Sequence, residues 1–118
     1  FALMDTAYGS TDLPFRQALF LWLTVISVNP RGWAVADGGL KALAMDHGDP
    51  TMVDHTVLYC SDEHLTFLPG PDGTLPAVGD RVRVLPAHVD PTVAKHQRMH
   101  LVRGEDVLGT GPIDLRHW

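Results

Sequence analysis

The sequence predicts a mainly β fold, either a small antiparallel barrel or a folded sheet. Polar and apolar residues alternate along Arg81–Leu85, which is the period of a strand with one buried face. Other short β-branched and apolar runs are separated by turn-forming groups such as Asn29–Gly32 and Gly104–Asp106. The chain contains no internal repeat and no low-complexity segment, so a compact arrangement of short strands is the expected architecture.

In the first half of the chain, the elements follow from apolar runs and the turns between them. Phe1–Met4 is expected to close a strand that arrives from an upstream domain, so the chain is expected to be the C-terminal piece of a longer protein. Phe15–Val28 begins with helical spacing but becomes β-branched, and we predict a strand. Trp33–Ala36 completes a hairpin with it, and Leu40–Asp46 is predicted to form a single helical turn.

In the second half, strands again alternate with turn signals, and one short helix is expected near Pro91. The terminal hairpin turns at Gly104–Asp106. The predicted strands are Val53–Cys60, His64–Leu68, Arg81–Val89, Met99–Arg103 and Val107–Ile113, with a turn of helix over Pro91–His96 and a loop tip at Pro69–Gly73.

Composition limits the possible functions. With 118 residues and 45% hydrophobic content, the chain has room for one domain with a modest core. A net charge of −5, with only Lys41 and Lys95 as lysines, argues against a surface for nucleic acid or anionic membrane. The longest apolar run, Ala18–Val28, is too short to span a membrane, and no signal peptide is recognised. Cys60 is the only cysteine, which fits a reducing cytoplasm.

His88 and Asp90 are the candidate metal ligands and the candidate catalytic residues. If the strand predicted over Arg81–Val89 is extended up to Pro91, residues two apart point to the same side, so both side chains can converge on one cation. An imidazole with a carboxylate suits Mn²⁺, Co²⁺, Zn²⁺ or Mg²⁺, and two protein ligands leave positions open for water or substrate. A lone His-x-Asp pattern is common by chance, so the spacing alone is weak evidence.

Four segments carry a resemblance to a known family. They are Ala34–Leu43, similar to Asp-Ala/Gly-Gly-x-Lys-Ala, Ser61–His64, similar to Ser-Glu-Glu-His, Val78–Val93, similar to Val-Gly-Asp followed by Pro-x-His-x-Cys/Asp-Pro-Thr, and Pro112–Asp114 with Arg116. In this order they resemble the C-terminal domain of the D-serine dehydratase and D-threonine aldolase family, pyridoxal phosphate enzymes of the alanine-racemase fold type. The resemblance covers most of the chain, which we expect to be one such β domain over residues 1–118. Gly111 departs from the pattern, since members often carry an aromatic residue there.

The resemblance implies a lyase with an upstream barrel that binds pyridoxal phosphate, while this domain supplies metal ligands. Family aldolases carry His-x-Asp and eukaryotic-type dehydratases carry His-x-Cys with zinc. Asp90 therefore favours a D-threonine aldolase-like enzyme with Mn²⁺, which cleaves a D-3-hydroxy amino acid to glycine and an aldehyde. Dehydration of D-serine or 3-hydroxyaspartate remains an alternative. From a different class, a free-standing β module that binds a metal or a partner without catalysis also remains open.

Several other residues have a possible functional role beside an ordinary structural one. Glu63 and His64 are candidates to orient the metal site, because ligating histidines usually need a carboxylate or carbonyl partner. His96 is a candidate to support a metal ligand or the cofactor, and we expect it to lie on a different element from His100. The segment Asp37–Lys41 is functional or, more simply, a turn that holds the sheet together. The remaining histidines, His47, His55 and His117, are expected to lie on the surface.

Two further expectations concern partners. Lys41 and Lys95 lie outside any motif for a Schiff base, so we expect this chain alone not to bind pyridoxal phosphate covalently and to be inactive. Large apolar side chains are numerous for a modest core, and we expect part of them to meet a neighbouring subunit in a homodimer; they are Phe15, Phe20, Trp22 and Trp33.

Overall fold

The computed structural model describes residues 5–114 and 116. Six strands form an antiparallel sheet in the order β3-β6-β1-β2-β5-β4, and β7 and β8 form a separate hairpin. The strands are β1 (Leu21–Asn29), β2 (Trp33–Ala36), β3 (Thr51–Met52), β4 (Thr56–Cys60), β5 (Leu65–Leu68), β6 (Arg81–Leu85), β7 (Arg98–Arg103) and β8 (Asp106–Pro112), with the helix α1 (Val89–Ala94) and a 3₁₀ helix at Thr6–Ser10.

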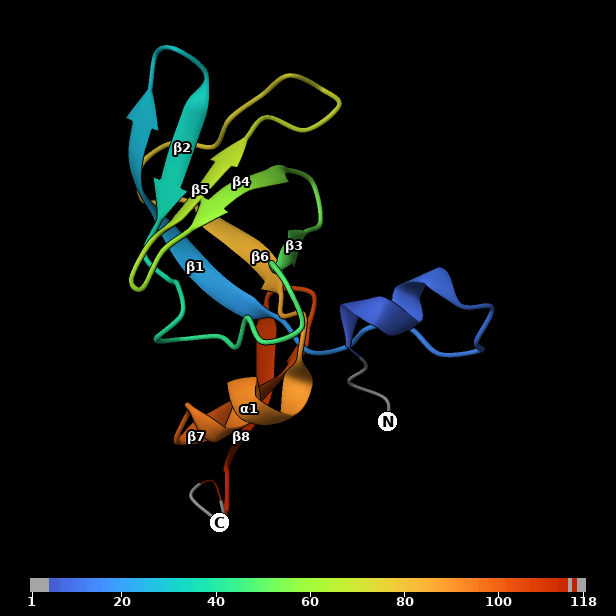
Figure 1. Ribbon diagram of the computed structural model, residues 1–118. Helices are drawn as coiled ribbons and strands as arrows, with labels where there is room; N and C mark the ends of the chain where they lie inside the picture. Colours follow the sequence, from blue (N-terminus) through green and yellow to red (C-terminus); the bar gives the residue numbers. More distant parts are fainter. Residues whose placement is uncertain (1–4, 115, 117–118) are drawn as a thin grey trace.

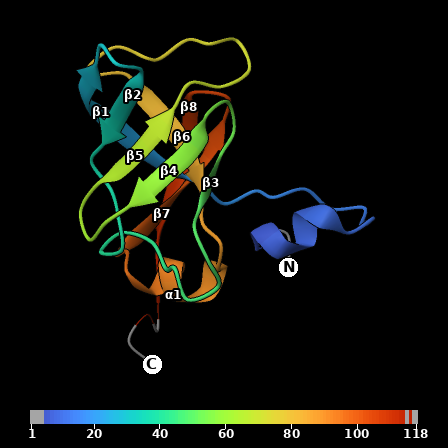
Figure 2. The same cartoon turned by 45° about the horizontal axis from the view of Figure 1, so that its top comes forward.

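The larger sheet curls until its two edge strands, β3 and β4, contact one another. Figures 1 and 2 show β4 and β5 lying across β1 and β6, with α1 below one end of this arrangement. Buried residues alternate with less buried ones along β2, β5, β6 and the first half of β1, as the period of an extended chain requires. The most deeply buried side chains include Val25, Ala34, Ala36, Leu43, Leu65, Phe67 and Val84. The predicted small antiparallel barrel or folded sheet is therefore confirmed.

Several predicted elements are confirmed with shifted bounds. The β1–β2 hairpin turns at residues 30–32, and the terminal hairpin pairs β7 with β8. The strand predicted over Val53–Cys60 begins only at Thr56, because a bend separates β4 from the short β3. The prediction for Phe1–Met4 lies outside the described residues.

The strand predicted over Arg81–Val89 is wrong in its second half. β6 ends at Leu85, directly before Pro86, which has no N–H to donate to a ladder. The helix α1 then begins at Val89 and includes Asp90 and Pro91. Proline is tolerated in a first helical turn because N–H groups there have no intrahelical partner. Pro91 therefore lies within a helix and does not mark the end of a strand.

The single helical turn predicted over Leu40–Asp46 is present only at the start of that segment, and it does not continue into a helix. The carbonyl oxygen of Gly39 accepts hydrogen bonds from the N–H groups of Ala42 and Leu43, which makes an isolated turn. This turn docks on the segment between β4 and β5, where the carbonyl oxygens of Ser61 and Asp62 accept N–H groups of Leu40 and Lys41. A Cβ atom at Gly39 would lie 2.1 Å from the carbonyl oxygen of Ser61. The glycine is needed for close backbone approach, which supports the structural reading of Asp37–Lys41.

The hydroxyl group of Thr92 attaches α1 to the barrel. Thr92 is 1% exposed, accepts the N–H of Ala44 at 2.9 Å and donates to the carbonyl oxygen of His88 at 2.6 Å. An antiparallel bridge also pairs Ala44 with His88. The start of α1 is therefore held against the segment that follows the Gly39 turn.

The large apolar side chains expected at an interface are covered to different extents. Phe15 is 56% exposed, whereas Phe20, Trp22 and Trp33 are half-buried. The guanidinium group of Arg83 lies over the rings of Phe20 and Trp22, at 5.3 and 5.9 Å from their centroids. The neighbouring subunit stays a prediction. Within residues 5–114, no helix combines the length and the apolar character that crossing a membrane requires.

Replacing Gly39 with alanine tests the close approach of the turn. The added Cβ meets backbone atoms of Ser61 and Asp62, which cannot rotate away. We expect Gly39→Ala to destabilise the fold by about 1–3 kcal/mol, measured by urea unfolding. Gly109→Ala is the matched control, because nothing lies within 4 Å of its added Cβ. Equal unfolding midpoints for the two variants would contradict the docking described here.

Replacing Thr92 with valine tests the attachment of α1. The variant keeps the shape of the side chain but leaves the buried N–H of Ala44 without its acceptor, so we expect a loss of about 1–3 kcal/mol in unfolding free energy. Thr92→Ser keeps the hydroxyl group and should lose less. A valine variant as stable as the parent would show that this hydroxyl group does not anchor the helix.

Neutralising Glu63 tests the exposed ion pair that it forms with Lys41 beside the turn. The hydrogen bond from Lys41 lowers the pKa of Glu63, so the pair stabilises the fold above the ordinary glutamate pKa and is lost as pH falls through the folded-state pKa. We expect Glu63→Gln to lower the melting temperature slightly at neutral pH and low salt. The difference from the parent should vanish in acid, and a difference that persists there would point to another cause.

Candidate metal centre

His88 directly precedes the first residue of α1, and its ring is held by a side-chain hydrogen bond. Its backbone is extended, with φ −129° and ψ 120°, and the next residue begins the helix. Its side chain is 21% exposed, and its Nδ1 atom lies 2.6 Å from Oδ2 of Asp46. The bridge to Ala44, two residues before Asp46, brings these two side chains together from distant parts of the sequence. The imidazole is thus fixed at one of its two ring nitrogens.

The carboxylate of Asp46 determines which ring nitrogen of His88 carries the proton. The hydrogen bond to His88 lowers the pKa of the Asp46 carboxyl group, which is therefore an acceptor at neutral pH. An acceptor at Nδ1 requires the proton to be on that atom, and in a neutral imidazole the other nitrogen then carries a free lone pair. Nε2 of His88 is consequently the atom available to a metal ion.

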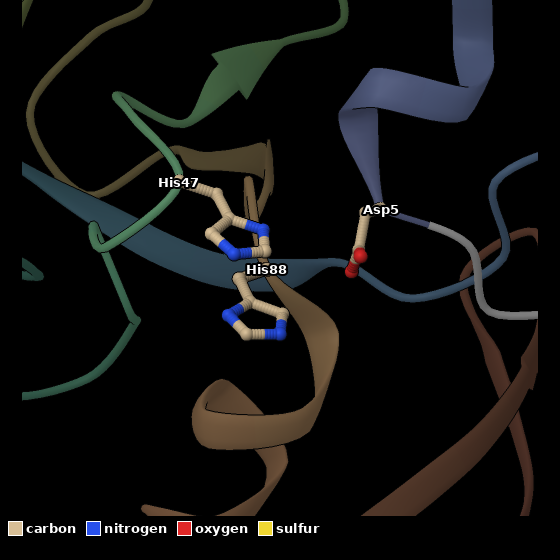
Figure 3. Close-up of side chains that lie close together, drawn as sticks. All are labelled: Asp5, His47 and His88. Carbon is tan, nitrogen blue, oxygen red and sulfur yellow. The ribbon is translucent and has the colours of Figure 1, made fainter.

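His47 stacks on His88, as Figure 3 shows. The ring centroids are 3.8 Å apart and the ring planes differ by only 4°. The lone pair of an imidazole nitrogen lies in the ring plane, so one ion cannot be in line with both rings while they are stacked. Of the two, His88 is the more buried and is held by Asp46, whereas the His47 side chain is 54% exposed. His88 is therefore the ligand candidate and His47 its neighbour.

Asp5 approaches the same place from the N-terminal segment. Potential ligand atoms of Asp5, His47 and His88 all lie within 4.8 Å of one another, and Figure 3 shows the Asp5 carboxylate at the side of the two rings. One oxygen of Asp5 accepts the N–H of Val89 at 2.6 Å, at the first residue of α1. The carboxylate thus binds the first residue of the helix and lies beside His88.

Asp90 lies in the first turn of α1 and is exposed. The argument that His88 and Asp90 share one face of an extended strand is wrong, because the backbone turns helical between them. Both residues nevertheless lie at the N-terminal end of the same helix, separated only by the buried Val89. Their joint role as ligands stays a prediction.

The other candidate residues have structural partners. Glu63 pairs with Lys41, and Nε2 of His96 lies 2.7 Å from the carbonyl oxygen of Ala42, within hydrogen-bond distance. His64 is exposed, and its backbone pairs with Ser61. Roles for Glu63, His64 and His96 in orienting the metal ligands stay predictions. As expected, His96 and His100 do not share an element, because His96 is in the connection after α1 and His100 is in β7.

Two of the histidines expected on the surface have neighbours. His47 is stacked on His88, and His55 is partly buried with its ring edge on Phe67, at 5.1 Å between centroids. The prediction for His117 lies outside the described residues. Sequence reasoning also missed Asp46 and Asp5. The need of a ligating histidine for a carboxylate partner was the available signal, but it pointed to Glu63, which lies within the recognised motif Ser61–His64.

The donors present fit a divalent cation. An imidazole nitrogen with carboxylate oxygens nearby is a mixed, moderately hard set, which suits Mn²⁺, Zn²⁺, Co²⁺ or Mg²⁺. Two hollows of the surface are lined by other residues. One is lined by Phe15, Phe20, Val53 and Arg83 among others, and the second by His55, Asp80, Arg81 and Glu105 among others. Neither of these two hollows is lined by Asp5, His47 or His88.

Comparison with known proteins identifies the family of the chain. The family model described as "Putative serine dehydratase domain" matches residues 18–102. A D-threonine aldolase of Arthrobacter sp. is 32% identical over 87% of this chain and 29% of its own length. A 3-hydroxy-D-aspartate aldolase of Paracoccus denitrificans is 34% identical over 98% of this chain and 33% of its own length. The chain thus spans about a third of these relatives.

Solved structures extend the comparison to the fold. The crystal structure of D-threonine aldolase from Filomicrobium marinum superposes with a TM-score of 0.85 and 33% identity, over 98% of this chain and 34% of that protein. An alanine-racemase-like protein from Idiomarina loihiensis has a TM-score of 0.72 at 22% identity, over 91% of this chain and 35% of that one, and shows the fold alone. Because the family model matches well over half of the chain, the chain belongs to the serine dehydratase domain family, as its four motifs predict.

Proposed function

We propose that this chain is the metal-binding β domain of a pyridoxal phosphate-dependent lyase that acts on D-3-hydroxy amino acids. The preferred reaction is retro-aldol cleavage to glycine and an aldehyde. Two relatives are named for substrates of this class, D-threonine and 3-hydroxy-D-aspartate, in which a hydroxyl group stands on the carbon beside the α-carbon. The single buried thiol of Cys60 is compatible with an enzyme of the reducing cytoplasm.

The observation that carries the proposal is the placement of His88. Its Nδ1 is held by Asp46, and a carboxylate oxygen of Asp5 lies within 4.8 Å of a nitrogen of its ring. We assign His88 and Asp90 as the ligands, with Mn²⁺ preferred and Zn²⁺, Co²⁺ or Mg²⁺ as alternatives. A divalent ion supplies Lewis-acid activation of an oxygen when it is bound. The role of the chain is to hold that ion at a fixed point and to leave its remaining positions open.

We assign pyridoxal phosphate to the part of the longer protein that this chain does not span. Lys41 is paired with Glu63 on the exposed side of the turn, and Lys95 directly follows α1, so neither lies in an enclosed site for a cofactor. The exposure of His47 and Asp90 beside His88 supports this division, because a substrate at this point would need walls from another part of the molecule. An upstream barrel and a second subunit are the proposed sources of these walls.

Dehydration and deamination of D-serine or 3-hydroxyaspartate is the second candidate reaction. The description of the matched family model favours it, and the same ligands serve both reactions. A metal- or partner-binding module without catalysis is the remaining alternative. Product analysis of the native-length protein with D-threonine and D-serine separates the three, since they yield an aldehyde, a 2-oxo acid or nothing.

Removing either ligand should abolish turnover without removing the cofactor. We expect His88→Ala and Asp90→Ala in the native-length protein to lower turnover by orders of magnitude and to leave the absorbance of the bound cofactor unchanged. His100→Ala is the control, because His100 lies in β7 beside Thr110. Asp90→Cys should shift the metal preference toward zinc, because a thiolate is a softer ligand. Full activity of Asp90→Ala under exhaustive chelation would refute the assignment.

A further inference from the structure

We propose that Asp46 is a positioning residue that holds His88 in the tautomer and orientation needed for metal binding. In this proposal the ring of His47 limits how far the His88 ring can tilt on one side. This inference rests on the proposed function, since it assumes that His88 is a metal ligand. It concerns two residues that lie 41 and 42 positions before His88 in the sequence and that contact it only in the fold.

The first step is the hydrogen bond. Oδ2 of Asp46 lies 2.6 Å from Nδ1 of His88 and 3.9 Å from Nε2 of His47, so the carboxylate is directed mainly at His88. A carboxylate has no proton to donate at neutral pH, so Nδ1 of His88 must carry one. Nε2 is left with its lone pair in the ring plane, on the side of the ring away from Asp46. Metal-binding histidines in general have such a partner on their second nitrogen.

The second step is the anchoring of Asp46 itself. Ala44 is bridged to His88, and its N–H is held by Thr92. Thr92 also binds the carbonyl oxygen of His88, so the two backbones are locked in register at this point. Asp46 is two residues beyond that bridge. The distance from Asp46 to the imidazole is therefore set by buried backbone contacts, although the carboxylate itself is 54% exposed.

The third step is rotation of the ring. A hydrogen bond at Nδ1 fixes one edge of an imidazole but still permits the plane to tilt. The parallel ring of His47, with its centroid 3.8 Å away, occupies the space into which His88 would tilt on that side. Together the two contacts fix both the position of Nε2 and the direction of its lone pair.

Stability alone does not account for this arrangement. An exposed carboxylate in contact with a histidine contributes little to folding in water. A positioning role and a merely structural role therefore predict different results. Loss of Asp46 should weaken metal binding and disturb the tautomer of His88 while leaving the melting temperature nearly unchanged.

The test compares Asp46→Ala, Asp46→Asn and the parent in the native-length protein. Affinity is measured by titration with Mn²⁺ and with Zn²⁺, and the tautomer of His88 by ¹⁵N NMR of labelled histidine without metal. We expect Asp46→Ala to bind both ions about 10–100-fold more weakly and to show His88 as a mixture of tautomers. Asp46→Asn should lie in between, because its amide oxygen still accepts a hydrogen bond.

Asp72→Ala is the matched control. Asp72 is also an exposed aspartate that accepts hydrogen bonds, from Thr74, and it lies in the loop before β6, at the far end of the barrel from α1 (Figure 1). It should leave affinity and tautomer unchanged. The inference would be overturned if Asp46→Ala bound metal as tightly as the parent and kept His88 in a single tautomer. The proposed function would still stand in that case if the parent bound metal and His88→Ala did not. A parent that binds no metal would instead refute the proposed function, and a tautomer mixture in that parent would refute the inference as well.

Discussion

The hydroxyl group of Thr92 is the contact on which the arrangement of the candidate site depends. It lies in the interior and joins two backbones that are far apart in the sequence, those of Ala44 and His88. Because both partners are main-chain groups, the contact fixes register as well as distance. The side chains on either side of this junction, Asp46 and His88, consequently meet at the surface. A buried hydrogen bond of modest energy thus determines the geometry of an exposed cluster.

The Gly39 turn supports the same junction from the other side. It docks by main-chain hydrogen bonds on the segment after β4, and the chain then passes through the buried Leu43 to Ala44. Two of the four motifs, the one around Gly39 and the one at Ser61–His64, therefore have a structural task. The third motif carries the candidate ligands, and the first two hold the segment against which these ligands are placed.

Most of the fold follows from local patterns in the sequence. The alternation of Arg81–Leu85 and the turn signals at Asn29–Gly32 and Gly104–Asp106 identify strands and hairpins because a strand with one buried face has a period of two. The extension of β6 to Val89 fails because Pro91 is equally suited to the first turn of a helix. His88 was found from the motif that contains it. Asp46, His47 and Asp5 were not, since their proximity to His88 arises only when distant segments pack together.

The central claim is that a divalent ion binds at Nε2 of His88 with Asp90 as its second protein ligand. The most direct measurement is a crystal structure of the native-length protein with Mn²⁺, with the ion located by its anomalous scattering. The account predicts one peak at coordination distance, roughly 2 Å, from Nε2 of His88 and from a carboxylate oxygen of Asp90, with Asp46 still at Nδ1. A peak bound by His47 in place of His88, or a fully loaded enzyme with no ion at His88, would contradict it.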